Sequence, residues 1–160
     1  MTIRCAIIDD EFLARKYIKE YIHKVPYLEL MGDYNSPLKA MEKLQEGTID
    51  LLFLDIQMPD ISGLDFLRSL DHKPYVILTT AYEEYALEGY ELQVTDYLLK
   101  PFSFDRFLKA VNKVDKSMQE RQSQPVDQNQ QQTQTDFKEN YIIIRADRKL
   151  YKINYEDLIY

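Results

Sequence analysis

Five polar residues stand directly after short apolar runs of the chain, and their types together could handle a phosphoryl group. They are Asp9, Asp10, Asp55, Thr80 and Lys100. Each alone has a simpler structural explanation, since an acidic pair after a strand commonly caps the next helix and a lysine before a proline is commonly solvated. Because they occur together, behind four separate apolar runs, they predict one shared site.

The chemistry of such a site follows from its charges. Carboxylates gathered in one place repel, because two unit charges about 4 Å apart interact by roughly 4 kcal/mol at an effective dielectric of about 20. A hard divalent cation removes that penalty, and Mg²⁺ prefers one or two carboxylates, water and a phosphate oxygen. Lys100 adds a compact positive charge and Thr80 a hydroxyl donor. Asp55 is therefore predicted to be a nucleophile that accepts a phosphoryl group, a reaction that needs mainly positioning and charge neutralisation.

Alternating strand and helix patterns would bring these residues to one edge of a sheet. Apolar runs between turn signals predict strands at residues 3–8, 27–34, 51–55, 75–78 and 97–99. Helical spacing is found at residues 12–25, after Ser36-Pro37, at 64–70, at 83–91, and after a cap at Ser103 or Asp105. This alternation predicts an α/β fold over residues 1–118, a doubly wound parallel sheet in the flavodoxin-like order 2-1-3-4-5.

The chain changes character after this domain. Residues 119–136 contain eight glutamines and a single apolar residue, Val126, so we predict a linker that cannot bury enough surface to offset its ordering entropy. Residues 137–160 begin a second folded segment, with two strand patterns at 141–145 and 149–153. These 24 residues are too few to form a core alone, so we expect an incomplete β segment, truncated early in a second domain.

Composition narrows the classes of function. The net charge of −7 argues against a basic nucleic-acid surface in this chain. No apolar run approaches the roughly 18 residues of a membrane span, and the first residues lack a signal-peptide pattern. The single cysteine, Cys5, excludes an internal disulfide and favours the cytoplasm. His23 and His72 are not spaced as metal ligands and are expected on the surface.

The motifs carrying these residues resemble the receiver domain of two-component response regulators over roughly residues 3–118. The matching stretches, in order, are Ile8-Asp9-Asp10-Glu11, Asp55-Ile-Gln-Met-Pro59, Gly63, Thr80-Ala81 and Lys100-Pro101-Phe102. Two runs, 80–87 and 96–102, are similar to the LytTR subclass, whose output is a mostly-β DNA-binding domain. Residues 141–160 resemble the first strands of that output domain.

The resemblance implies a role for each matching residue. A sensor histidine kinase would donate a phosphoryl group to Asp55, with Mg²⁺ as cofactor. Asp10, Asp55 and the Gln57 main-chain carbonyl would ligate the ion, with Asp9 assisting. Thr80 and Lys100 would hold the phosphoryl group.

The resemblance also implies a switch and an output. Thr80 and Tyr97 would form the switch pair, and the Lys100-Pro101 bond would be cis. The phosphorylated chain would form a homodimer through its fourth helix, fifth strand and fifth helix, and would control transcription. DNA would bind only through a complete C-terminal domain, and no residue of this chain is predicted to contact it.

Two other functions were weighed against this interpretation. A phosphatase with an aspartyl nucleophile, like the haloacid dehalogenase group, needs a second Asp two residues later as its general acid. That position is Gln57, which cannot transfer a proton, so we expect a phosphoacceptor and not an enzyme. An interaction or dimerisation module that works without phosphorylation is the other alternative, and the complete acidic site argues against it.

Overall fold

Five parallel strands form the central sheet of the first domain. The structure is a computed structural model, and it describes residues 1–123, 141–146 and 149–154. The strands are β1 (Ile3–Ile8), β2 (Leu28–Tyr34), β3 (Leu51–Asp55), β4 (Tyr75–Thr80) and β5 (Asp96–Leu99). Their order, β2-β1-β3-β4-β5, and the parallel pairing of every neighbour confirm the predicted topology.

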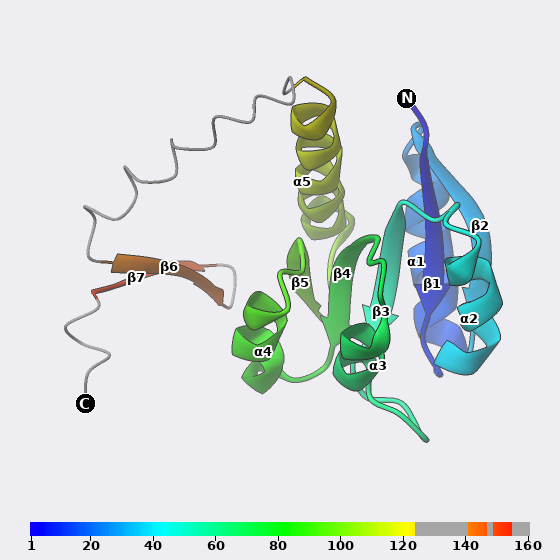
Figure 1. Ribbon diagram of the computed structural model, residues 1–160, viewed down its shortest axis with the longest axis horizontal. Coiled ribbons are helices and arrows are strands. Elements are labelled where there is room, and N and C mark those ends of the chain that lie inside the picture. The colour runs from blue at the N-terminus through cyan, green and yellow to red at the C-terminus, as the bar shows by residue number, and fades with distance from the viewer. Residues whose placement is uncertain (124–140, 147–148, 155–160) are drawn as a thin grey trace.

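Helices cover both faces of this sheet (Figure 1). They are α1 (Phe12–Lys24), α2 (Pro37–Gln45), α3 (Gly63–Ser69), α4 (Ala86–Glu91) and α5 (Phe104–Ser123), with a short 3₁₀ turn, η1 (Glu83–Tyr85), before α4. Each strand contributes alternate side chains to the two faces, because strand side chains have a period of two. The three-layer arrangement therefore has two apolar cores, one on each side of the sheet.

The two cores fix β1 and β3 most firmly. In β3 every residue is buried, with Phe53 facing the core under α1 and α5 and with Leu52 and Leu54 facing the opposite core. The Phe53 ring stacks on Phe107 of α5, with centroids 5.2 Å apart. A strand held on both faces and between two neighbours cannot shift, so Asp55 at its end is held rigidly.

Some element predictions differ from the structure. The fourth helix, predicted over 83–91, starts as a 3₁₀ turn and is α-helical only from Ala86. Gly89 is buried there, and a Cβ would come within 2.9 Å of the Leu78 side chain, so the glycine brings α4 close to β4 at the cost of helix propensity.

Ser103, the first of the two caps proposed for the fifth helix, accepts a hydrogen bond from the Arg106 amide at 3.2 Å.

The fifth helix is longer than the sequence suggested. It runs to Ser123, into the first five residues of the segment predicted as a linker. Those residues lack apolar side chains, but a helix anchored by packing extends easily through good helix formers such as Gln, Glu and Arg. The rest of the predicted linker lies outside the described residues.

Three apolar side chains of the first two helices lie in solvent. They are Leu13 and Tyr17 of α1 and Leu38 of α2. In α1 the second apolar stripe, Ile18 and Ile22, is the buried one. A helix packed on one side of a sheet buries one stripe, so the other remains exposed.

The two predicted C-terminal strands form an antiparallel pair. They are β6 (Tyr141–Ala146) and β7 (Lys149–Asn154), in register from Tyr141 opposite Asn154 to Ala146 opposite Lys149. The residues predicted to follow them, 155–160, lie outside the described part of the chain. Among the described helices, none combines the length and the apolar character that crossing a bilayer requires.

Candidate functional site

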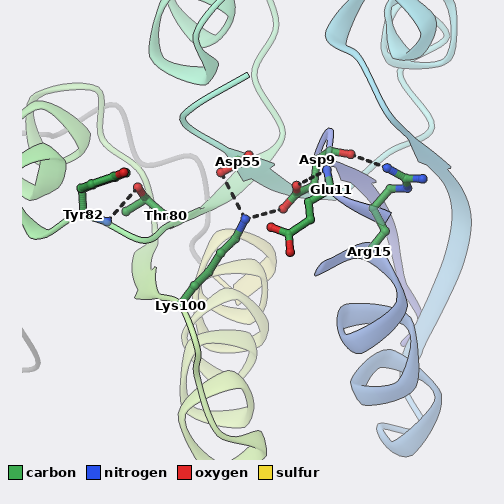
Figure 2. A network of polar contacts seen from close by, with 7 residues as sticks. All are labelled: Asp9, Glu11, Arg15, Asp55, Thr80, Tyr82 and Lys100. Atoms are coloured by element: carbon green, nitrogen blue, oxygen red, sulfur yellow. Dashed lines mark hydrogen bonds and ion pairs between the residues drawn. The ribbon is translucent and has the colours of Figure 1, made fainter. Parts of the chain in front are cut away.

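The carboxyl ends of β1, β3, β4 and β5 bring the predicted site residues to one edge of the sheet (Figure 2). Asp55 is paired in register with Thr79, and Thr80 with Leu99, the residue before Lys100. The Lys100 amide donates to the Thr80 carbonyl at 2.7 Å, which extends the β4–β5 ladder into the site. Parallel strands thus place side chains close together that are up to 91 residues apart in sequence.

Three carboxylates form the acidic part of the site. Asp9 and Asp55 are buried, whereas Asp10 is exposed at the mouth. One oxygen from each of the three lies within 4.8 Å of the others. This arrangement of two buried carboxylates and one accessible carboxylate has the oxygen-only donor set and the open side that Mg²⁺ prefers.

Lys100 is the cation that faces these carboxylates. Its ammonium nitrogen lies 2.8 Å from Asp9 Oδ2 and 3.4 Å from Asp55 Oδ1. Burial alone would lower the pKa of Lys100, but the hydrogen bond and the charge of Asp9 outweigh burial and raise that pKa. Lys100 therefore stays charged. Its single positive charge does not balance the three carboxylates, so the cluster has excess negative charge.

The excess charge acts on Asp55. Burial and the neighbouring charge of Asp9 raise the pKa of the Asp55 carboxyl to about 7, against the opposing effect of Lys100. A carboxyl in this condition either holds a proton or needs another cation beside it. The raised pKa of Asp55 shows that the site lacks positive charge, so a divalent ion fits the residues present.

The loop after β3 is held close to Asp55. The Ile56 amide donates to the Thr79 carbonyl at 3.1 Å, and the Gly63 amide donates to the Ile56 carbonyl at 2.8 Å. A Cβ at position 63 would overlap the main-chain oxygen of Asp55, so only glycine lets α3 begin this close to the site. These contacts fix the main chain just before Gln57, whose carbonyl stays a predicted ligand.

The two predicted switch residues are connected through Tyr82, which sequence reasoning missed. The Thr80 hydroxyl accepts from the Tyr82 amide at 3.2 Å, and the Tyr97 hydroxyl donates to the Tyr82 carbonyl. Burial raises the pKa of Tyr97 to about 12, so its hydroxyl remains a donor. Thr80 is buried and Tyr97 is half-buried, and their roles in switching stay predictions.

Two further contacts were not foreseen. The exposed Gln57 side chain donates to the Tyr85 hydroxyl at 3.1 Å and connects the loop after β3 to η1. Arg15 of α1 donates to the main-chain carbonyl of Asp9 at 2.7 Å. A signal for Arg15 existed, because a cation in the first turn of a helix is unfavourable unless an acidic partner is nearby.

Two other predictions, the cis proline bond and the two surface histidines, are confirmed. The Lys100-Pro101 peptide is cis. His23 and His72 are exposed, and Cys5 is buried in the core under α1 and α5.

Comparison with known proteins agrees with this geometry. The family model of the response regulator receiver domain matches residues 5–112. The chain belongs to this family. The match covers β1 to the middle of α5 and includes every residue of the acidic site.

Curated relatives include regulators of two named kinds. The transcriptional regulatory protein BtsR of Escherichia coli K12 is 37% identical over 126 residues, covering 78% of this chain and 52% of its own length. The sensory transduction protein LytT of Enterococcus faecalis is 33% identical over 155 residues, covering 95% and 62%. LytT of Bacillus cereus is 28% identical over 162 residues, covering 99% and 65%. The LytTR-type resemblance is thus confirmed, and the chain spans about half to two thirds of the length of these relatives.

Solved receiver domains share the fold. The response regulatory domain of MrkE from Klebsiella pneumoniae aligns with a TM-score of 0.68 at 30% identity, over 74% of this chain and 99% of that one. The receiver domain of AraT, a response regulator from Geobacillus stearothermophilus, aligns with a TM-score of 0.68 at 31% identity, over 77% and 100%. The receiver fold therefore accounts for the first domain.

Proposed function

We propose that Asp55 accepts a phosphoryl group from a phosphohistidine of a sensor histidine kinase, with Mg²⁺ bound at the acidic site. The single observation that carries this proposal is the buried Asp55 carboxyl, whose pKa is raised to about 7 between Asp9 and Lys100. An ionised carboxylate in this position costs free energy in the unphosphorylated protein. A divalent ion bound together with the phosphoryl group would neutralise that charge and offset the cost. The acidic pair and the lysine are the partners that such a group needs.

The transfer step is a displacement at phosphorus. An Asp55 carboxylate oxygen attacks the phosphorus atom, the phosphorus–nitrogen bond to the donor imidazole breaks, and the imidazole nitrogen takes up a proton. When bound, Mg²⁺ would neutralise charge on the phosphoryl oxygens, and Asp10, Asp55 and the Gln57 carbonyl would hold it, with Asp9 assisting. Lys100, already 3.4 Å from Asp55, would pair with one phosphoryl oxygen.

The switch would act through Tyr82. On phosphorylation, the Thr80 hydroxyl would turn from the Tyr82 amide toward a phosphoryl oxygen, since a charged acceptor makes a stronger hydrogen bond. Loss of that bond would free the Tyr82 peptide, to which the Tyr97 hydroxyl is attached. Tyr97 and η1 would then shift together, which is a two-state change biased by one added charge.

The output we propose is transcriptional control through homodimerisation and a complete C-terminal DNA-binding domain. Residues 1–118 would form the receiver, 119–136 the linker and 137–160 the first part of the output domain. Three apolar side chains are exposed here: Tyr82, just before η1, and Leu87 and Tyr90 on α4. Acidic residues on the same segment (Glu83, Glu84, Glu88 and Glu91) would face basic residues on α5 (Lys109 and Lys116) of a second copy.

The cytoplasm is the compartment that fits a kinase partner and the free thiol of Cys5.

The test uses a small phosphoramidate donor and intact-mass spectrometry. The wild-type chain with Mg²⁺ is expected to gain the mass of one phosphoryl group, and Asp55→Asn or a chelator should abolish the gain. Asp60→Asn, in the exposed loop beyond the site, is the matched control and should be modified like the wild type. No gain with several donors would overturn the proposal and leave the phosphorylation-independent module.

The same samples test the phosphatase alternative. Gln57 stands where that class needs its general acid, and its amide is bonded to Tyr85. We therefore expect no sustained turnover of a phosphate monoester. Sustained turnover that Asp55→Asn removes would mean that the protein is an enzyme.

A further inference from the structure

Arg15 lies on the side of Asp9 that faces away from Asp55 and Lys100 (Figure 2). From the first turn of α1, its Nη1 donates to the Asp9 carbonyl at 2.7 Å, and its Nε donates to Asp33 Oδ2 of β2 at 3.3 Å. The side chain is only 13% exposed. A guanidinium can hold both partners at once because its donors form a rigid fork.

The hydrogen bond to Asp9 fixes a peptide plane. The Asp9 amide is bound to the Tyr34 carbonyl at 3.0 Å, and Asp9 Oδ1 accepts from the Glu11 amide at 2.9 Å. Its other carboxylate oxygen is bound to Lys100. The Asp9 carbonyl is thus the group that Arg15 holds, and this carbonyl is coplanar with the amide and Cα of Asp10.

Orientation of that plane determines where Asp10 can place its carboxylate. Asp10 lies beyond the end of β1 and is exposed, and its side chain reaches the Asp55 carboxyl from that position. From this geometry we infer that Arg15 is a positioning residue for divalent-ion binding, acting on Asp10 through the Asp9–Asp10 peptide. This inference rests on the proposed function, because it assigns Asp10 to the ion.

The direction in which the Kd for Mg²⁺ changes distinguishes a positioning role of Arg15 from an effect of its charge. A cation beside a site for Mg²⁺ repels the ion, so removing the charge of Arg15 would by itself strengthen Mg²⁺ binding. Loss of positioning would weaken it, since partners that orient metal ligands commonly contribute about tenfold or more in affinity. The two explanations thus predict opposite changes for the same substitution.

Lys19 supplies a matched control one helical turn away. Its ammonium group lies 2.8 Å from the same Asp33 Oδ2, but among its described contacts none reaches Asp9. Lys19→Met removes one positive charge from the same face of α1 and leaves the Asp9 carbonyl bound. Arg15→Met removes the same charge together with that hydrogen bond.

The experiment titrates Mg²⁺ alone into the 160-residue chain and follows amide chemical shifts by NMR. Arg15→Met is expected to raise the Kd for Mg²⁺ about tenfold, while Lys19→Met stays within about twofold of the wild type. Melting temperatures without metal, measured in parallel, report any purely structural loss, which would leave the Kd of the folded protein unchanged. An unchanged or lower Kd in Arg15→Met would overturn the inference.

A second variant keeps the test decisive if Arg15→Met does not fold. Arg15→Lys retains the charge, but one ammonium group cannot hold both partners and pairs with the Asp33 carboxylate in preference to the neutral Asp9 carbonyl, so we expect a Kd raised about threefold. A wild-type Kd in Arg15→Lys would then overturn the inference. If the wild-type chain itself bound no Mg²⁺, the proposed function would fail, which is a different result from wild-type binding that Arg15 does not affect.

Discussion

At the scale of single residues, the site is an unbalanced charge cluster held by the fold. Lys100 lies within ion-pair distance of both Asp9 and Asp55, yet one ammonium group cannot neutralise three carboxylates. Burial, together with the charge of Asp9, raises the pKa of Asp55 to about 7. The cluster therefore favours any added cation, and the electrostatic cost falls mainly on Asp55, the proposed phosphoryl acceptor.

The raised pKa gives a stability prediction with a definite sign. An Asp whose pKa is about 7 when folded and 3.8 when unfolded adds stability that is complete below pH 3.8 and lost as the pH rises through about 7. Without Mg²⁺, Asp55→Asn should therefore be more stable than the wild type at pH 8, by roughly 1–3 kcal/mol. Urea unfolding at pH 8 and pH 5 measures the difference, which should shrink at the lower pH. A variant less stable than the wild type at pH 8 would contradict this account.

Residue types indicated the chemistry, but not the whole network. The five site residues were identifiable because each lies at or just after the carboxyl end of a strand, and a parallel sheet brings those ends to one edge. They are Asp9, Asp10, Asp55, Thr80 and Lys100. Tyr82 was not identifiable in this way, because it acts through its main-chain amide and carbonyl. Arg15 was indicated only by its place in the first turn of a helix, because its partner is the main-chain carbonyl of Asp9. Main-chain contacts depend on the local path of the chain, which residue identity does not reveal.

At the scale of elements, β5 is attached to α5 by a buried ion cluster. Arg106 donates to both oxygens of Asp96 at 2.8 Å and to the Tyr97 carbonyl at 3.1 Å, and Lys113 lies 2.9 Å from Asp96. Burial alone would raise the pKa of Asp96, but the hydrogen bonds from Arg106 and Lys113 outweigh it and lower that pKa. The strand that carries Tyr97 and leads to Lys100 is held by this cluster.

Removing the Asp96 charge should loosen this attachment. Asp96→Asn leaves the Arg106 guanidinium without its carboxylate, and we expect a loss of about 2–4 kcal/mol of unfolding free energy at pH 7. Because folding lowers the pKa of Asp96, its contribution is complete above the unfolded value of 3.8 and is lost as the pH falls below it. Urea unfolding at pH 7 and at about pH 2.5, well below the unfolded value, should show the variant approaching the wild type at the lower pH. An equal deficit at both values would argue against the ion cluster.

The turn between β3 and α3 gives a second prediction for an element. Gly63→Ala would force a methyl group against the main-chain oxygen of Asp55, so we expect a loss of at least about 2 kcal/mol and slower phosphorylation. Gly47→Ala is the control, because open space surrounds that glycine and only its positive φ of 72° opposes the change. It should cost about 1 kcal/mol without affecting phosphorylation. Equal phosphorylation rates in both variants would contradict the proposed role of this turn.

Strands were easier to predict than helix ends. The apolar runs of β1 and β3 need burial on both faces, which determines their position within a residue or two. The ends of α4 and α5 depend on close packing at Gly89 and on extension of a packed helix to Ser123. Neither cause is visible in hydrophobic periodicity.

For the whole molecule, the account predicts a phosphorylation-dependent homodimer. Leu87 of α4 is 52% exposed, and it lies next to the segment that Tyr97 and Gln57 connect to the site. Sedimentation velocity should show a monomer that dimerises when a phosphoryl donor and Mg²⁺ are added. Leu87→Glu should weaken dimerisation about tenfold or more, whereas Leu38→Glu, at an exposed leucine of α2, should not. Dimerisation of Leu87→Glu as strong as that of the wild type would exclude the α4 face as the interface.

Identifying the modified residue tests the central claim most directly. The phosphorylated chain can be reduced with borohydride, which converts an aspartyl phosphate to homoserine, and its peptides sequenced by mass spectrometry. The account predicts homoserine at Asp55 alone, dependent on Mg²⁺. Modification at Asp9, Asp10 or any other residue, with Asp55 unmodified, would contradict it.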